Sequence, residues 1–380
     1  MNLYTAFFRP LMFLFPTETA HNIAVKLAEA ASQSSFLLAV VNNSFAFNTT
    51  SHFLEQTLFG LDFPNPIGLA AGFDKNGVAL PFWDALGFGF LTMGTVTAQC
   101  QSGNPRPRMF RSPKDAALLN RMGFNNRGAA NVAAHLKKSF GQKKQPKVPV
   151  GISIGKSKVI DPSHLAEVIA DHIISMTLLY DYADFFELNV TSPNTPGLRT
   201  LLAPDKLRPL LENLLRHLKL MWTESLPCRS HAAHNTKRDR KPLLVKLSPD
   251  MSDDEVREVI DLVLELGVDG VVNGNTTIDP STIPSLAHEQ GGRSGKHLFP
   301  RTLKRTSFIR ELAPGLPLIA VGGIFTPKDA VEVIREGADL VQGYTGFVFQ
   351  GPSYVGDIAE GIHQTMVERH AISIKNLQRH

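Results

Sequence analysis

Two amides and a hydroxyl lie close together where a buried strand gives way to a turn. The segment from Tyr182 to Val190 is rich in apolar and aromatic residues, which is typical of a buried parallel strand. Two prolines and a glycine then interrupt regular structure and force a turn, which carries Asn189, Ser192 and Asn194. An asparagine side chain both donates and accepts hydrogen bonds, so this group could hold a flat polar ligand. Turns of this composition are common, however, and the segment alone leaves an ordinary turn and a binding loop equally open.

Other polar residues and glycines occur at similar positions along the chain. Lys246 stands inside the apolar run Leu243–Leu247, where a buried functional lysine is favoured over a lysine in a surface salt bridge. Gly322, Gly323, Gly343 and Gly346 follow the last two predicted strands, and such glycines let backbone N–H groups approach a phosphate. For any single glycine a tight turn is the better interpretation, but two clusters together favour a phosphorylated ligand. No Walker or Rossmann motif is present, so neither a nucleoside triphosphate nor a dinucleotide is indicated.

The elements that must position these residues alternate between strands and helices. Helices are predicted over Pro162–Leu179, Pro204–Met221, Ser252–Leu266 and Pro327–Glu336, three of them opened by a proline. The pattern predicts a (β/α)8 barrel, with a doubly wound open sheet as the rival, and clustering of polar residues at the strand ends favours the barrel. The eight predicted strands are Pro66–Phe73, Phe88–Val96, Pro149–Gly155, Phe185–Thr191, Pro242–Ser248, Gly270–Thr276, Pro317–Ile324 and Leu340–Phe347.

Four further segments precede the barrel pattern or connect its elements. The first 45 residues predict short amphipathic helices, one capped by Thr17 with Ala20, Ile23, Ala24 and Leu27 on one face. The segment 57–65 predicts a hairpin, and Val96–Leu118 predicts a long irregular loop of the kind that forms binding walls. The basic segment 227–241 predicts a solvated surface loop.

Composition limits the classes of function. Of the 380 residues 43% are hydrophobic and 19% charged, which describes a folded protein with one large domain and a small addition. A net charge of +4 is too small to indicate nucleic acid binding. Two distant cysteines provide neither a disulfide framework nor a metal site. No apolar run reaches the length of a membrane span, and neither a signal peptide nor an organelle presequence is predicted.

The segment 187–199 (ELNVTSPNTPGLR) resembles the active-site loop of the dihydroorotate dehydrogenases, in the membrane-associated, quinone-using class (class 2). Residues 7–21 (FFRPLMFLFPTETAH) are similar to the N-terminal extension of that class. The resemblance implies a domain of residues 1–45 that sits on the membrane and forms a quinone tunnel, and a barrel of residues 46–380 that holds FMN and substrate. It implies oxidation of dihydroorotate to orotate in pyrimidine biosynthesis, at the cytoplasmic face of a bacterial-type inner membrane as a peripheral protein.

The resemblance also assigns residues to the cofactor and the substrate. Orotate is a flat ring of alternating donors and acceptors with one carboxylate, which suits amide side chains and one lysine. The implied FMN contacts are Ala70, Ala71, Gly72, Phe73, Asp74, Thr95, Ser153, Asn189, Lys246, Gly274, Gly295, Gly323, Tyr344 and Thr345. The implied substrate contacts are Lys75, Asn120, Arg121, Met122, Gly123, Phe124, Asn189, Asn194, Asn275 and Thr276.

Ser192 matches the base of this class, which removes a proton from C5 of the substrate while hydride passes from C6 to the flavin. Serine is a weak base, and the sequence shows no adjacent histidine to activate it. Thr195 and Phe124 match residues that help a water chain carry the proton away. The implied quinone tunnel includes His21, Arg111 and Tyr344, although His21 and Arg111 taken alone are more often surface residues.

Two positions depart from the family pattern. Ser153 stands where an asparagine is usual, and Gly274 stands where a threonine is usual, so fewer flavin contacts are expected at both. Two other functions remain open on the sequence: a soluble-type flavin dehydrogenase with another acceptor, and a membrane-tethered barrel that binds a phosphorylated ligand without catalysis. The soluble class lacks the extension and uses a cysteine base, and neither Cys100 nor Cys228 lies in the matching loop.

Overall fold

The structure, a computed structural model, describes residues 3–49, 51–142, 144–225 and 239–378. Eight parallel strands close into a barrel in the order β10-β12-β13-β3-β4-β7-β8-β9. The (β/α)8 prediction is confirmed, each strand falls inside its predicted range, and the rival open sheet is wrong because β9 pairs with β10 and closes the ring. The strands are β3 (Ile67–Leu69), β4 (Phe90–Val96), β7 (Val150–Ile154), β8 (Phe185–Leu188), β9 (Leu243–Leu247), β10 (Gly270–Asn273), β12 (Leu318–Val321) and β13 (Leu340–Gly343).

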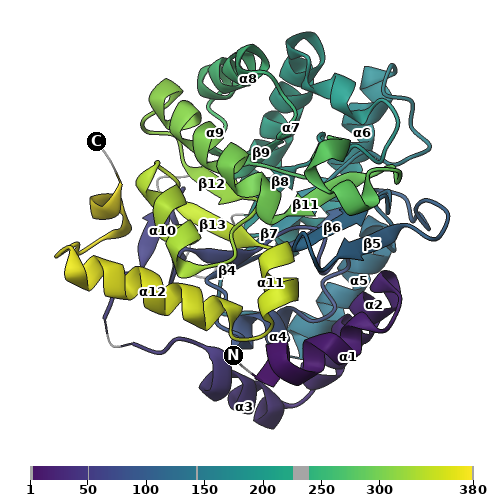
Figure 1. The fold of residues 1–380 in the computed structure, drawn as a ribbon. Helices are drawn as coiled ribbons and strands as arrows, with labels where there is room; N and C mark the ends of the chain where they lie inside the picture. Colours follow the sequence, from purple (N-terminus) through teal and green to yellow (C-terminus); the bar gives the residue numbers. More distant parts are fainter. Residues whose placement is uncertain (1–2, 50, 143, 226–238, 379–380) are drawn as a thin grey trace.

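Helices surround the barrel (Figure 1). They are α4 (Leu80–Ala85), α5 (Ala129–Gly141), α6 (Leu165–Leu179), α7 (Pro204–Ser225), α8 (Asp253–Leu266), α9 (Phe299–Leu312), α10 (Pro327–Arg335), α11 (Thr345–Gln350) and α12 (Tyr354–Glu368). The predicted starts of α7, α8 and α10 are confirmed, and Ser252 caps α8 through a reciprocal bond with Glu255. The predicted start of α6 at Pro162 is wrong. Asp161 accepts hydrogen bonds from Ser163, and this turn delays the helix to Leu165.

A short antiparallel hairpin, β1 (Gln56–Leu58) and β2 (Leu61–Phe63), confirms the prediction for residues 57–65. It lies against the first residues of the barrel strands. Phe63 packs edge-on against Phe90 at 5.5 Å between ring centroids, and Phe59 packs against Phe185 at 5.9 Å. This apolar floor, completed by buried side chains of β9, β10, β12 and β13, closes the N-terminal end of the barrel.

A small sheet stands beside the opposite end of the barrel. It consists of β5 (Met109–Ser112), β6 (Ala117–Asn120) and β11 (Gly292–Gly295), all antiparallel. The prediction of an irregular loop over Val96–Leu118 is therefore wrong for β5 and the start of β6. Their third strand comes from a distant part of the sequence, so the local pattern does not reveal the sheet.

Four helical segments precede the barrel: η1 (Tyr4–Phe8), α1 (Arg9–Phe13), α2 (Thr17–Ala31) and α3 (Ser35–Phe45). They lie at the lower end of the molecule in Figure 1. Thr17 does not cap α2, because Pro16 occupies the capping position. Of the predicted apolar face, Ala24 and Leu27 are exposed, and Ala28 is the buried residue of this helix.

Polar contacts tie this extension to the barrel. Arg108 of the barrel, which is nearly fully buried, pairs with Glu18 at 2.8 Å. The Tyr4 hydroxyl donates to the Val348 carbonyl at 2.7 Å, and Arg9 donates to the Phe349 carbonyl at 3.0 Å, both in α11. No single described helix is long and apolar enough to cross a membrane. The predicted insertion falls almost entirely on residues 226–238, which lie outside the described residues.

Candidate active site

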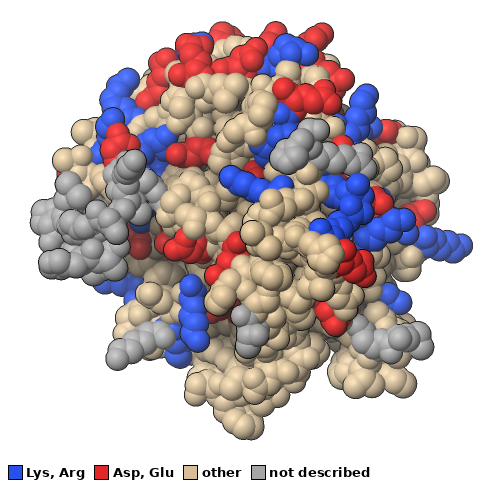
Figure 2. All heavy atoms as spheres, turned by 90° about the vertical axis from the view of Figure 1, so that its left-hand side faces the viewer, with Lys and Arg blue, Asp and Glu red and all other residues tan. Residues whose placement is uncertain are grey.

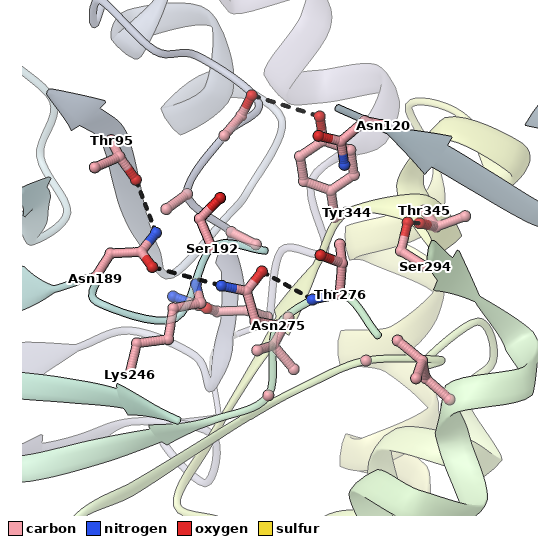
Figure 3. A pocket seen from close by; sticks show the side chains of 18 of the residues that line it. Thr95, Asn120, Asn189, Ser192, Lys246, Asn275, Thr276, Ser294, Tyr344 and Thr345 are labelled. Carbon is pink, nitrogen blue, oxygen red and sulfur yellow. Dashed lines mark hydrogen bonds between the residues drawn. The ribbon is translucent and has the colours of Figure 1, made fainter. Parts of the chain in front are cut away.

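A cavity opens at the C-terminal ends of the barrel strands. Ten of its residues are labelled in Figure 3, which shows side chains from several strand ends directed toward a common space. Most of the predicted site residues line it: Ala70, Ala71, Gly72, Lys75, Thr95, Asn120, Met122, Gly123, Phe124, Asn189, Ser192, Asn194, Lys246, Gly274, Asn275, Thr276, Gly295, Gly323, Tyr344 and Thr345.

A chain of amides and hydroxyls joins the ends of three strands, β4, β8 and β10, around the cavity. The Asn189 side-chain amide donates to the Thr95 hydroxyl at 2.9 Å, and its oxygen accepts from the Thr191 hydroxyl at 3.0 Å. The Asn275 amide in turn donates to the Thr191 hydroxyl at 2.7 Å, and its oxygen accepts from the Thr276 backbone N–H at 2.8 Å. Because each amide is held by neighbours on other strands, the cavity presents donors and acceptors at fixed positions.

Ser192 lies in the loop after β8 and is 7% exposed. Its hydroxyl oxygen accepts a hydrogen bond from the Asn194 backbone N–H at 3.3 Å. Arg199, further along the same loop, donates to the Thr191 carbonyl at 3.1 Å and pairs with Asp250 at 3.1 Å. The loop that carries the serine is thus tied to the loop after β9.

Lys75 is half-buried at the rim, where Nζ donates to the Asn125 side-chain oxygen at 2.8 Å and to the Met122 sulfur at 3.1 Å. Burial and, to a lesser extent, the positive charge of Arg108 lower the pKa of Lys75 to about 7, although the negative charge of Glu18 opposes the change. A carboxylate that binds beside Lys75 would restore the charged form of the lysine.

The glycines at the other side of the cavity form a backbone cradle. Gly323 has φ +75°, and a Cβ there would lie 2.3 Å from the Phe299 backbone nitrogen. Gly274 has φ +125°, and a Cβ there would lie 2.1 Å from the Val321 carbonyl oxygen. Only glycine fits either position. The departure from threonine at Gly274 therefore has a local structural reason in this chain.

Four predicted residues of the cofactor and substrate set do not line the cavity. Asp74 is buried and accepts hydrogen bonds from two backbone N–H groups and from the Trp83 indole, so it holds the turn before α4. Phe73 packs among aromatic rings. The Ser153 hydroxyl lies 3.0 Å from the Thr95 hydroxyl, outside the cavity lining. Arg121 pairs with Glu289 at 2.6 Å outside the cavity.

The three residues predicted for a quinone tunnel lie between the extension and the cavity. His21 of α2 packs edge-on against Phe73 at 5.4 Å, and Phe73 packs against Tyr344 at 5.4 Å, which lines the cavity. Burial lowers the pKa of His21 to about 4, with a further contribution from Lys75, so this imidazole is neutral at physiological pH. Arg111 donates to the Phe13 carbonyl at 2.7 Å and stacks over its ring, which fixes the end of α1.

The surface of the extension is strongly apolar. Figure 2 shows few charged side chains at the lower end of the molecule, where α3 lies in Figure 1. The exposed large apolar side chains of this segment are Leu3, Phe7, Phe8, Leu11, Leu14, Phe15, Leu27, Phe36, Leu37 and Val40. An exposed apolar surface of this extent is typical of a contact with another apolar phase.

Several lining residues were not predicted as contacts. They are Ser294, Leu298, Val321, Ile324 and Gln342, whereas Gly322 and Gly346, which also line the cavity, belong to the predicted glycine clusters. Gln342 is an amide inside the apolar run Leu340–Gly343, and the signal that identified Lys246 would have identified it as well. Ser294 lies 2.8 Å from the Thr345 hydroxyl across the glycine cradle, and nothing in its local sequence indicates that contact.

Comparison with known proteins decides the family. The family model described as dihydroorotate dehydrogenase matches residues 53–366, which span the whole barrel. The chain belongs to the dihydroorotate dehydrogenase family. The resemblance inferred from the sequence is thereby confirmed, and members of this family are flavin-dependent oxidoreductases.

Similar proteins cover nearly the entire chain. A dihydroorotate dehydrogenase (quinone) from Rhodococcus opacus is 43% identical over 364 residues, 94% of each chain. One from Chloroflexus aurantiacus is 42% identical over 353 residues, 90% of this chain and 92% of the relative. The solved dihydroorotate dehydrogenase of Eimeria tenella in complex with ferulenol is 32% identical with a TM-score of 0.80, over 95% of this chain and 94% of that one.

Proposed function

We propose that this chain oxidises dihydroorotate to orotate in pyrimidine biosynthesis, with FMN in the barrel cavity and a membrane quinone as electron acceptor. The observation that carries the proposal is the convergence, in one cavity, of a lysine, four asparagines, a serine and a glycine cradle. A carboxylate-bearing amide ring and a phosphorylated flavin together satisfy that set of groups.

The residues of the cavity fit a flavin mononucleotide. The backbone at Gly295, Gly323 and Thr345 would hold the phosphate, since the two glycines have no side chain to obstruct it. Gln342 supports the fit, because its side-chain oxygen is buried without a hydrogen-bond partner in the described structure. Lys246 would lie near the ring. When bound, the flavin accepts two electrons from the substrate as a hydride.

The substrate would lie between Lys75 and the strand-end amides. Lys75 would neutralise the substrate carboxylate, and the amides of Asn120, Asn189, Asn194 and Asn275 would match the ring's donors and acceptors. Because these side chains already bond one another around the cavity, they hold the ring in one orientation at little entropic cost.

Ser192 would accept the proton from C5 of dihydroorotate. Its hydroxyl is nearly buried and faces the cavity, and the hydrogen bond from Asn194 fixes its position (Figure 3). Thr195 is buried in the same loop and Phe124 lines the cavity, so both are placed for the proton relay that the resemblance implies.

The extension, residues 1–45, would bring the quinone to the barrel, residues 46–380. The contacts from His21 through Phe73 to Tyr344 form a continuous aromatic path toward the cavity. The exposed apolar side chains of the extension would enter the interfacial region of a lipid bilayer. We place this contact at the cytoplasmic side of a bacterial-type inner membrane, with the protein peripheral to it.

Absorbance spectroscopy tests the proposal. The purified protein should show a flavin spectrum that anaerobic dihydroorotate bleaches, and release of FMN on denaturation identifies the cofactor. A colourless protein would support a binding function without catalysis and would contradict the proposal.

A matched pair of surface variants tests the membrane contact. Leu14→Asp places a charge on the exposed face of the extension, whereas Val159→Asp does so on the barrel, where Val159 is similarly exposed. Leu14→Asp should lower turnover with vesicles that contain quinone and leave bleaching by dihydroorotate intact. Equal turnover in the two variants would remove the extension from the quinone reaction.

A further inference from the structure

The eight barrel strands, all of whose residues the structure describes, contain only two charged residues, Glu187 of β8 and Lys246 of β9. These two form an ion pair, with Lys246 Nζ 3.1 Å from Glu187 Oε1. The lysine side chain is 5% exposed and the glutamate side chain is not exposed at all. Two charges have therefore been placed in the interior of the barrel, next to each other and away from water.

The geometry gives the pair a direction. Side chains alternate along a strand, and Phe185 lies in the apolar floor while Asn189 lines the cavity, so Glu187 points into the barrel between these two levels. Lys246 lines the cavity and Glu187 does not. The pair is thus a dipole with its positive end at the cavity and its negative end beneath it.

Stability does not explain this arrangement. Breaking a buried ion pair is costly, but replacing the whole pair by apolar residues is often neutral or stabilising. In addition, the second carboxylate oxygen of Glu187, Oε2, has no hydrogen-bond partner among the described residues, which leaves the pair incompletely satisfied. The incompletely hydrogen-bonded carboxylate of Glu187 is better explained by its electrostatic effect on Lys246, which lines the cavity.

We infer that Glu187 is a positioning residue for Lys246: its carboxylate keeps the ammonium charged and directed at the floor of the cavity before any ligand binds. An ammonium has three N–H donors, and Glu187 is its recorded partner in the described structure, so donors remain for a ligand above it. A preformed positive charge requires no reorganisation when negative charge develops on the ligand. The inference rests on the proposed function, in which that ligand is a flavin.

The experiment measures the reduction potential of the bound flavin as a function of pH, in the full-length protein, from pH 6 to pH 9. Glu187→Gln keeps the shape of the side chain and removes its charge. Lys246 in this variant should lose its proton at the upper end of the range while the flavin is oxidised, and regain it on reduction. Each additional proton taken up with two electrons makes the reduction potential of the flavin fall by about 30 mV more per pH unit.

Other ionisable groups near the cavity also affect how the reduction potential depends on pH, so the variant is compared with the parent protein. Lys75 and Tyr344 also line it, while Ser153 and Val272, which the neighbouring strands β7 and β10 place in register with Glu187 and Lys246, carry no charge. Lys75 and Tyr344 are unchanged in the variant, so the difference between variant and parent isolates the pair. Asp339→Asn is the matched control, since it breaks a buried ion pair with Arg310 before β13 and should keep the parental slope.

Two further variants keep the inference testable. Glu187→Asp retains the charge, so the slope of its flavin reduction potential against pH should equal that of the parent protein. In a Lys246→Met background Glu187→Gln should have no further effect, because a buried carboxylate without a partner takes up a proton and is neutral already. If Glu187→Gln alone fails to fold, this double variant should fold, since it buries no unpaired charge.

The outcomes separate the two proposals. A Glu187→Gln protein with the parental slope throughout the pH range overturns the inference, as does a double variant that still fails to fold. In both cases a parent protein whose flavin is bleached by dihydroorotate leaves the proposed function standing. A parent protein without flavin contradicts the proposed function itself.

Discussion

The affinity of this enzyme for orotate should depend on pH through one side chain, Lys75. Burial lowers the pKa of Lys75 to about 7, so the lysine is charged below that pH and neutral above it. The product carboxylate prefers the charged form, and once bound it keeps the lysine protonated. Affinity should therefore be highest in mild acid and fall as the pH rises through 7.

The expected magnitude follows from the fraction of charged lysine in the free enzyme. With a pKa of about 7, this fraction is about 0.9 at pH 6 and about 0.03 at pH 8.5, so the Kd for orotate should rise about 30-fold. Burial lowers the pKa of His21 to about 4 and raises that of Tyr344 to about 12, so neither of these neighbours changes its charge in this range.

Titration of the flavin absorbance with orotate measures this Kd at each pH. Lys75→Arg is the matched control, because arginine stays charged throughout and its profile should be flat, although its different shape lowers affinity at every pH. A Kd for the parent protein that varies less than about twofold from pH 6 to pH 8.5, against this factor of about 30, would refute the reasoning.

Three other outcomes are expected. Ser192→Ala should keep its flavin and slow flavin reduction by dihydroorotate about 100-fold or more in stopped flow, and unchanged reduction would remove the serine from the role of base. Gly323→Ala should lose flavin on gel filtration, because its Cβ would lie 2.3 Å from a backbone nitrogen at φ +75°, whereas Gly141→Ala, with nothing within 4 Å, should retain it. Glu18→Gln should leave Arg108 short of a charged partner and weaken docking of α2 by about 1–3 kcal/mol, seen as faster amide exchange over residues 17–31. Although burial alone would raise the pKa of Glu18, Arg108 and Arg106 lower it overall, so in the parent protein the same effect should develop progressively as the pH falls below 4.5 and through this lowered pKa.

The barrel could be predicted from the sequence because its information is local. Most strands are short apolar runs that glycine or a polar residue ends or follows, and α7, α8, α9 and α10 carry a proline or a cap at their starts. The small sheet of β5, β6 and β11 could not be predicted in this way. Its strands are four residues long, and the strand that completes it lies far along the chain.

The sequence predicted which segments of the chain form the cavity better than it predicted which side chains line it. Asn120, Met122 and Gly123 line the cavity while Arg121 between them points elsewhere, which follows from the alternation of side chains along an extended segment. Asp74 follows the same logic, since its carboxylate is used by the turn before α4. A motif identifies the backbone that approaches a ligand, but hydrogen bonds to distant residues decide which side chains reach it.

The hairpin β1–β2 has a consequence for the order of events in turnover. Its aromatic rings block one mouth of the barrel, so both reactants must arrive at the other. There, the rim around Lys75 and the path beginning at His21 reach the cavity from different elements, the loops and the extension. Orotate and quinone would then enter and leave by separate routes, so saturating the enzyme with one should not prevent the other from binding.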